Sequence, residues 1–179
     1  MQVISKRFLS ILFILLVSYH CFSQVNDTNL TNKFSFEGFN IKFPSSWTID
    51  STGIMGTKLI MFAALEDEAD KFRENVNIII QDLKGQDVDF EKYKQISETQ
   101  IRTILVNGKI IQSVIYKSGK EAFYKINYEM TQNNFRLNIT SLCYMKKEQA
   151  YLATFTCESA KYEQYKKLGE AILNTFSVE

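Results

Sequence analysis

The chain has 179 residues, 45% of them hydrophobic, and its 21 basic and 20 acidic side chains give a formal net charge of +1. This near balance, with no basic stripe along the sequence, excludes nucleic acid as an expected partner. The length suits one domain, large enough to bury a core without disulfides.

The N-terminus has the pattern of a secretory signal peptide. Lys6 and Arg7 precede the apolar run 8–17, which is shorter than the roughly 20 residues that a membrane-spanning helix needs. Cleavage is expected after Ser23, so that residues 1–23 are removed. His20 stands immediately before Cys21, where lipoprotein signals carry a small residue, and this disfavours a lipid anchor on Cys21. We expect an exported protein, periplasmic or extracellular, with no transmembrane segment after signal removal.

Signal removal also changes the chemistry that the chain can perform. It leaves 156 of the 179 residues, with 19 basic and 20 acidic side chains, and takes away His20, the only histidine. Without histidine there is no Ser-His-Asp triad or Cys-His pair, and the commonest ligand of zinc, copper and iron is missing. The composition therefore predicts a protein that is not an enzyme and that needs no metal or other cofactor.

The first half of the domain is expected to consist of strands. A polar, flexible lead (24–33) comes first, and the domain itself covers 34–179. Apolar periodicity predicts strands at 34–36, 39–43, 47–49, 58–65 and 76–83. Glu37-Gly38 is a tight-turn signal between the first two. The strand at 58–65 is apolar at nearly every position, which predicts a central strand buried on both faces.

A helix and two hairpins follow. Residues 88–106 show an apolar stripe with helical spacing, with Asp87 as the expected N-cap and Asn107-Gly108 as the end. The stripe is Phe90, Tyr93, Ser97, Ile101 and Ile104. Strands are predicted at 110–117, 121–130, 135–145 and 151–157, with turns at Ser118-Gly119-Lys120 and Asn133-Asn134. A last helix is expected after a Ser159 cap, with the stripe Tyr162, Tyr165, Leu168, Ile172 and Phe176.

Two cysteines remain in the mature chain, both in the last hairpin. Pairing Met145 with Tyr151 places Cys157 opposite Ile139, four residues along the ladder from Cys143, or roughly 13 Å at strand rise. A disulfide needs Cα atoms within about 7 Å. Both cysteines are therefore expected to be buried free thiols.

Sequential hairpins and two amphipathic helices together predict the fold class. We expect an α+β fold with a largely antiparallel sheet, flanked by the two main helices in an αβα-like sandwich, as a single domain.

The segment Phe39–Trp47, FNIKFPSSW, is similar to the F-x-I-x-F/Y-P-x-x-W opening of the PsbP-like superfamily, which includes photosystem II extrinsic, Mog and DcrB-type proteins. Asn75–Ile80 resembles that family's central strand, and the likeness spans Phe34 to Glu179. The resemblance implies a layered fold around an antiparallel sheet. It also implies a non-enzymatic accessory or adaptor protein of the bacterial cell envelope, with another envelope protein as partner. Metal binding proposed for photosystem relatives leans partly on histidine, which the mature chain lacks.

Three local features allow more than one interpretation. The acidic cluster Glu66–Asp70 could hold Ca²⁺ or Mn²⁺, but it lacks the spacing of a calcium loop, and a solvated loop is expected instead. Phe123 is expected to pack beneath a helix, with an exposed contact patch as the alternative. Four aromatic side chains are expected in the core: Phe34, Phe36, Trp47 and Phe62. Their alternative is an aromatic-lined pocket between sheet and helix, which would make the protein a carrier of a small hydrophobic ligand or lipid. No single residue stands out as a binding residue.

Overall fold

The computed structural model of the protein describes residues 29–119 and 121–179. The expected signal sequence, its cleavage after Ser23, Cys21 and most of the lead lie outside the described residues. Among the described helices, none is long and apolar enough to cross a membrane.

The main layer is a seven-stranded antiparallel sheet in the order β3-β4-β5-β9-β8-β7-β6. Its strands are β3 (Thr48–Asp50), β4 (Leu59–Phe62), β5 (Asn75–Asp82), β6 (Lys109–Ser118), β7 (Glu121–Gln132), β8 (Phe135–Lys146) and β9 (Gln149–Glu158). The predicted strand at 58–65 is shorter and lies next to the edge strand rather than at the centre. Its burial on both faces is confirmed, because Ile60 and Met61 are both buried.

The N-terminal hairpin joins a second, smaller sheet, which the sequence did not suggest. β1 (Asn32–Phe36) and β2 (Phe39–Phe43) pair across Glu37 and Gly38, and the C-terminal β10 (Ser177–Val178) pairs with the other side of β2. Both turn residues have positive φ, 42° and 81°. This is the geometry that two-residue hairpins favour, since its twist matches that of the strands.

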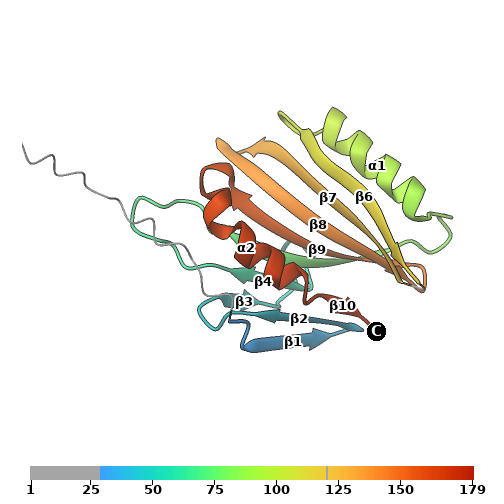
Figure 1. The fold of residues 1–179 in the computed structure, drawn as a ribbon, viewed down its shortest axis with the longest axis horizontal. Helices are drawn as coiled ribbons and strands as arrows, with labels where there is room; N and C mark the ends of the chain where they lie inside the picture. Colours follow the sequence, from blue (N-terminus) through green and yellow to red (C-terminus); the bar gives the residue numbers. More distant parts are fainter. Residues whose placement is uncertain (1–28, 120) are drawn as a thin grey trace, which may run out of the picture.

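Two α-helices lie on opposite faces of the large sheet, as Figure 1 shows. α1 (Phe90–Thr103) covers one face at β6 and β7, and α2 (Tyr162–Leu173) packs on the other face, between the large sheet and the small one. The larger core lies around α2 and contains Phe39, Ile41, Val76, Phe155, Leu168 and Ile172. A smaller core lies under α1 and contains Ile101, Tyr124, Ile126, Cys143 and Ala150. The α+β class, the single domain and the two flanking helices are thus confirmed.

Both expected helix caps are wrong. The N-cap of α1 is Asp89, whose Oδ1 accepts the Lys92 backbone N–H at 2.8 Å. Asp87 instead adopts a left-handed φ of 47° in the preceding turn. Ser159 begins a short 3-10 turn, Ser159–Lys161, and its buried hydroxyl has no hydrogen-bond partner among the described residues. The expected apolar stripe of the last helix is confirmed, because Tyr165, Leu168 and Ile172 are buried.

The β8–β9 hairpin is shifted by one residue from the predicted register. Tyr144, rather than Met145, lies opposite Tyr151. The cause is a two-residue turn at Lys147 and Glu148, whose φ values of 50° and 59° close the hairpin more tightly than the assumed five-residue loop. A one-residue shift reverses which face a side chain points to. Cys143 and Cys157 therefore lie in different cores, and both are buried free thiols as predicted.

The predicted core aromatics divide into three groups. Trp47 is buried and Phe34 is partly buried against the larger core. Phe62 is half-covered by the Arg73 guanidinium, 4.9 Å from its ring centre. Phe36 is 43% exposed, because β1 is the edge strand of the small sheet, and its assignment to the core is wrong. Phe123 is partly buried and packs against the larger core.

Candidate functional site

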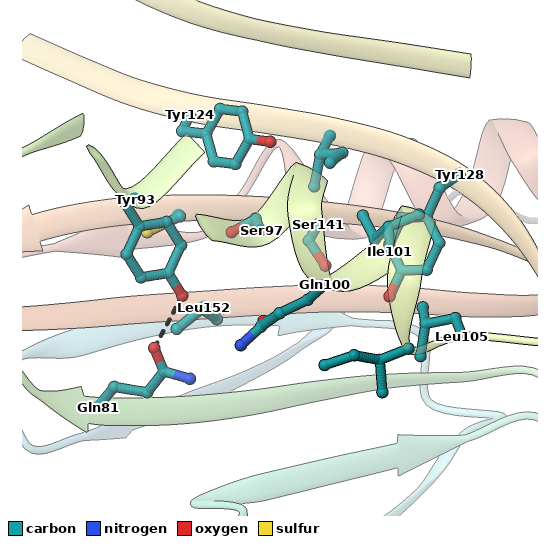
Figure 2. A pocket seen from close by; sticks show the side chains of 13 residues that line it. Gln81, Tyr93, Ser97, Gln100, Ile101, Leu105, Tyr124, Tyr128, Ser141 and Leu152 are labelled. Carbon is teal, nitrogen blue, oxygen red and sulfur yellow. Dashed lines mark hydrogen bonds between the residues drawn. The ribbon is translucent and has the colours of Figure 1, made fainter. Parts of the chain in front are cut away.

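A pocket of about 310 Å³ lies between α1 and the large sheet. This volume is at the lower end of the range for small-molecule sites. Its floor comes from β5, β7, β8 and β9, and its roof comes from α1 and the turn that follows it. Three tyrosines contribute to the lining, Tyr93, Tyr124 and Tyr128, together with five leucine and isoleucine side chains. Figure 2 shows the pocket from close by.

The space arises because small side chains face one another at the centre of the contact. On α1, Ser97 occupies a place in the apolar stripe where a larger residue would reach the sheet. On β8, Ser141 and Cys143 present short side chains to the same pocket. Ile101 is the one residue of α1 that is fully buried, and Phe90 and Tyr93 pack against the same core. The short side chains leave a space between this part of the helix and the sheet.

Some polar groups of the pocket form hydrogen bonds within the protein and others do not, Gln100 among them, which is exposed to solvent. The Tyr93 hydroxyl donates to Gln81 Oε1 at 2.8 Å, and Ser141 pairs with Thr154 at 2.7 Å. In the view of Figure 2, Gln100 lies between Tyr93 and Tyr128. The Gln100 amide and the Tyr128 hydroxyl have no hydrogen-bond partner within residues 29–119 and 121–179. Both are available to a ligand.

The lining carries no charged side chain. Burial raises the pKa of the Tyr124 hydroxyl and of the Cys143 thiol, each to about 12, and raises the pKa of Tyr93 and Tyr128 above the ordinary tyrosine value. All four groups are therefore neutral near pH 7. The pocket offers neither a thiolate nucleophile nor a group that exchanges protons near neutrality.

A charged side chain, Glu98, lies beside the pocket on the helix that covers it. Glu98 of α1 receives Lys94 Nζ at 2.8 Å and Arg102 Nη1 at 3.3 Å. Together with a hydrogen bond from Ser113 of β6, they lower the pKa of Glu98 to about 2. The Ser113 hydroxyl also lies 3.0 Å from the Tyr124 hydroxyl. This chain of contacts links the polar side of α1 to the sheet and to one wall of the pocket.

No protein-family model and no curated protein sequence matches the chain. Solved structures do match it. Cyanobacterial PsbP (CyanoP) from Synechocystis sp. PCC 6803 superposes with a TM-score of 0.62 at 12% identity, over 83% of this chain and 92% of that one. The chain has a PsbP-like fold. Two further structures support this: PA94 from Pseudomonas aeruginosa (TM-score 0.59, 12% identity, 83% and 96% covered) and LpqN from Mycobacterium tuberculosis (0.55, 8%, 82% and 89%).

In this PsbP-like fold, the acidic cluster Glu66–Asp70 binds to the start of α2. Lys161 Nζ lies 2.9 Å from Asp70 Oδ2 and 3.4 Å from Glu66 Oε2. Gln164 and Tyr165 donate to Glu66 Oε1 at 2.7 and 3.0 Å. The described residues contain no group of three or more acidic, cysteine or histidine side chains that could hold a metal ion. The carboxylates of Glu66 and Asp70 therefore anchor the loop to the helix.

A buried acid that was not predicted from the sequence lies close to this anchor. Glu74 is 0% exposed, with Oε1 accepting the Glu158 backbone N–H at 3.3 Å and the Cys157 thiol at 3.7 Å. Its Oε2 has no hydrogen-bond partner among the described residues. Burial raises the pKa of Glu74. Glu74 stands just before β5, outside the strand predicted at 76–83, and no sequence pattern marked it as buried.

The structure has a pocket between sheet and helix with aromatic side chains in its lining, as the alternative prediction had it, but the aromatic residues are different ones. None of the four aromatics named for it lines the pocket beneath α1. Tyr93, Tyr124 and Tyr128 line it instead. Tyr93 lies on the predicted helix stripe, and Tyr124 and Tyr128 share one face of the strand predicted at 121–130. That pattern does not distinguish a pocket wall from a packed core.

Proposed function

We propose that the protein is a non-catalytic protein of the cell envelope that binds a small, uncharged, largely apolar ligand in the pocket beneath α1. The observation that carries this proposal is a pocket of about 310 Å³ whose lining is entirely uncharged and includes two unpaired polar groups. The envelope location rests on the signal-like N-terminus. LpqN, whose fold is similar, is involved in cell envelope biogenesis.

The lining restricts the chemistry of the ligand. Ile101, Ile126 and Leu152 provide an apolar surface for its body. Gln100 and Tyr128 provide hydrogen bonds for one polar end, such as a carbonyl or hydroxyl group. A charged ligand would lose its hydration on entry without gaining an opposite charge, which is costly. The pocket should therefore discriminate by charge more strongly than by shape.

A pair of fluorescent probes tests this directly. N-phenyl-1-naphthylamine is neutral, and 1-anilinonaphthalene-8-sulfonate is the same ring system with a sulfonate. We expect the neutral probe to bind saturably, with one probe per chain, and the anionic probe to bind about tenfold more weakly or not at all. Ser97→Trp fills the pocket and should abolish binding of the neutral probe. Gln95→Trp, on the exposed side of the same helix, should leave it unchanged.

Two results would refute ligand binding at this site. One is a wild-type protein that binds neither probe. The other is equal loss of binding in Ser97→Trp and Gln95→Trp. If neither result is found, native mass spectrometry of protein purified from its host should identify a retained molecule. The mass of that molecule should be absent from the spectrum of the Ser97→Trp variant.

The adaptor role that the resemblance implies stays a second prediction. The observation that favours it is a set of exposed apolar side chains on and beside the edge strand β6: Ile104, Val106, Ile111, Val114 and Tyr116. Cross-linking of a tagged copy in its host tests this role. One envelope protein recovered in near-stoichiometric amount supports it, and recovery of the tagged protein alone contradicts it.

A further inference from the structure

The outer side of β6 is a free sheet edge. β6 is ten residues long and pairs with β7 on one side, and no described segment pairs with its other side. A bulge at Ile110–Gln112 interrupts its start, and the strand is regular from Gln112 onward. Edge strands of this length expose a row of unpaired backbone N–H and C=O groups that can pair with another strand.

The side chains of this edge are unusually apolar for an exposed strand. Ile111 is 52% exposed, and Val114 and Tyr116 are 37% and 38% exposed. Val114 and Tyr116 point to the face that carries α2, yet α2 lies over the middle of the sheet and not over β6 (Figure 1). This part of the face has no covering layer within the described residues.

Tyr116 is also the end of an aromatic row that crosses the sheet. Its ring stacks on Phe123 of β7 with centroids 5.0 Å apart, and Phe123 stacks on Tyr144 of β8 at 5.3 Å. Tyr144 lies opposite Tyr151 of β9. The row thus continues from strand to strand and stops at the edge. A strand added beside β6 would place its own side chain next to Tyr116, where an aromatic ring extends the row.

The charges of the strand disfavour a second copy of the chain as the natural partner. The ionisable side chains of β6 with a charge at neutral pH are Lys109 and Lys117, one near each end, and neither forms an ion pair within the described residues. A second β6 strand would bring the same two positive charges to the edge, with no acidic side chain on the strand to offset them. Like charges near one another destabilise strand pairing, whereas acidic side chains near the lysines stabilise it.

We propose that β6 binds an extended segment of another protein by strand addition. The segment carries an aromatic residue opposite Tyr116 and acidic residues near Lys117 and Lys109. Main-chain hydrogen bonds to the free edge provide most of the affinity in such complexes, and the side chains provide the selectivity. This surface lies outside the pocket beneath α1, and its use does not depend on ligand binding there.

A designed peptide tests the proposal on the intact mature protein. The probe is Glu-Phe-Thr-Val-Thr-Val-Thr-Ser-Glu, which in antiparallel alignment sets phenylalanine opposite Tyr116 and the first glutamate opposite Lys117, and brings the last glutamate near Lys109 beyond the bulge. A second peptide has lysine at both ends. At millimolar concentration, we expect the acidic peptide to shift the backbone amide NMR signals of Gln112–Lys117 and to slow their hydrogen exchange, and the lysine peptide to bind at least about fivefold more weakly.

Variants separate this surface from general effects of charge. Lys117→Glu should weaken the acidic peptide about fivefold or more and strengthen the lysine peptide. Tyr116→Ser should weaken both peptides. Lys167→Glu, an equal change on the exposed side of α2, should leave both affinities unchanged.

Three outcomes would overturn the proposal. The first is the absence of shifts on β6 with the acidic peptide. The second is equal affinity for the two peptides. The third is a concentration-dependent dimer of the wild-type protein that Tyr116→Ser dissociates, since this would show that a second copy occupies the edge.

Discussion

Replacement of Gly169 by alanine is the most direct test of how α2 packs on the large sheet. Gly169 is buried in the middle of α2, and a Cβ atom there would lie 2.5 Å from Phe155 Cδ1 and Cε1 and 2.6 Å from Cζ. Optimal carbon–carbon contacts are about 3.5–4.0 Å. Phe155 is 1% exposed within the larger core, so its ring has little room to move.

The net effect follows from two opposing contributions to the free energy of unfolding. Alanine is a better helix former than glycine by about 1 kcal/mol. Overpacking a core costs about 1–3 kcal/mol, and contacts 1 Å too short belong in the upper part of that range. We therefore expect Gly169→Ala to destabilise the protein by about 1–2 kcal/mol.

Urea unfolding measures this difference, provided that the slope with denaturant is unchanged. The matched experiment is a double-mutant cycle with Phe155→Leu, which shortens the ring side chain. Because the clash involves both positions, Gly169→Ala should cost less in the Phe155→Leu background than in the wild type. The close contact between α2 and β9 would be contradicted if Gly169→Ala were as stable as the wild type. It would also be contradicted if the two substitutions had additive effects on the free energy of unfolding.

Three further predictions concern ionisable groups. Burial opposes ionisation of Asp70, but Lys161 and neighbouring backbone N–H groups outweigh it and lower the pKa of Asp70. Its contribution to stability is present above the unfolded pKa of about 3.9 and is lost as the pH falls, so Lys161→Met should flatten the loss of stability between about pH 5 and pH 3 in urea unfolding. Because burial raises the pKa of Glu74, its ionisation destabilises the fold as the pH rises, and Glu74→Gln should gain more stability relative to the wild type at about pH 7 than at about pH 4. Glu98, with a pKa of about 2, contributes above about pH 4.3 and loses its effect toward pH 2, so Glu98→Gln at neutral pH should speed hydrogen exchange in α1 and leave α2 unchanged.

Periodicity and turn residues were sufficient to predict strands β1 to β9, both helices and the antiparallel hairpins, but not β10 or the small sheet. Glu37-Gly38 and Asn133-Asn134 are turn signals, and both pairs adopt the left-handed backbone that such residues tolerate. The turn at Lys147 and Glu148 has the same geometry without its sequence signal. A longer loop was therefore assumed, and this placed the β8–β9 register one residue out. Asp87 and Asp89 are both acceptable caps by type, and only the local backbone distinguishes them.

The pocket could not be predicted, although the stripes that contribute to it were. Ser97 and Tyr124 lie on the expected inner faces of α1 and β7, where a filled core would use the same pattern. Whether space remains depends on how far α1 stands from the sheet. That distance depends on interactions between separate elements, such as the packing of Ile101 into the smaller core and the contact of Glu98 with Ser113. The exposure of Phe36 could not be predicted from the sequence for the same reason, since it follows from the position of β1 at the edge of the small sheet.

The placement of the two cysteines on opposite faces of the sheet provides a pair of native reporters. Burial raises the pKa of both thiols, so neither reacts while its face stays covered. Cys143 becomes accessible to a thiol reagent when α1 lifts, and Cys157 only when the larger core opens. The ratio of the two labelling rates would therefore report how independently the two faces of the sheet become exposed by local opening, without the need for an introduced cysteine.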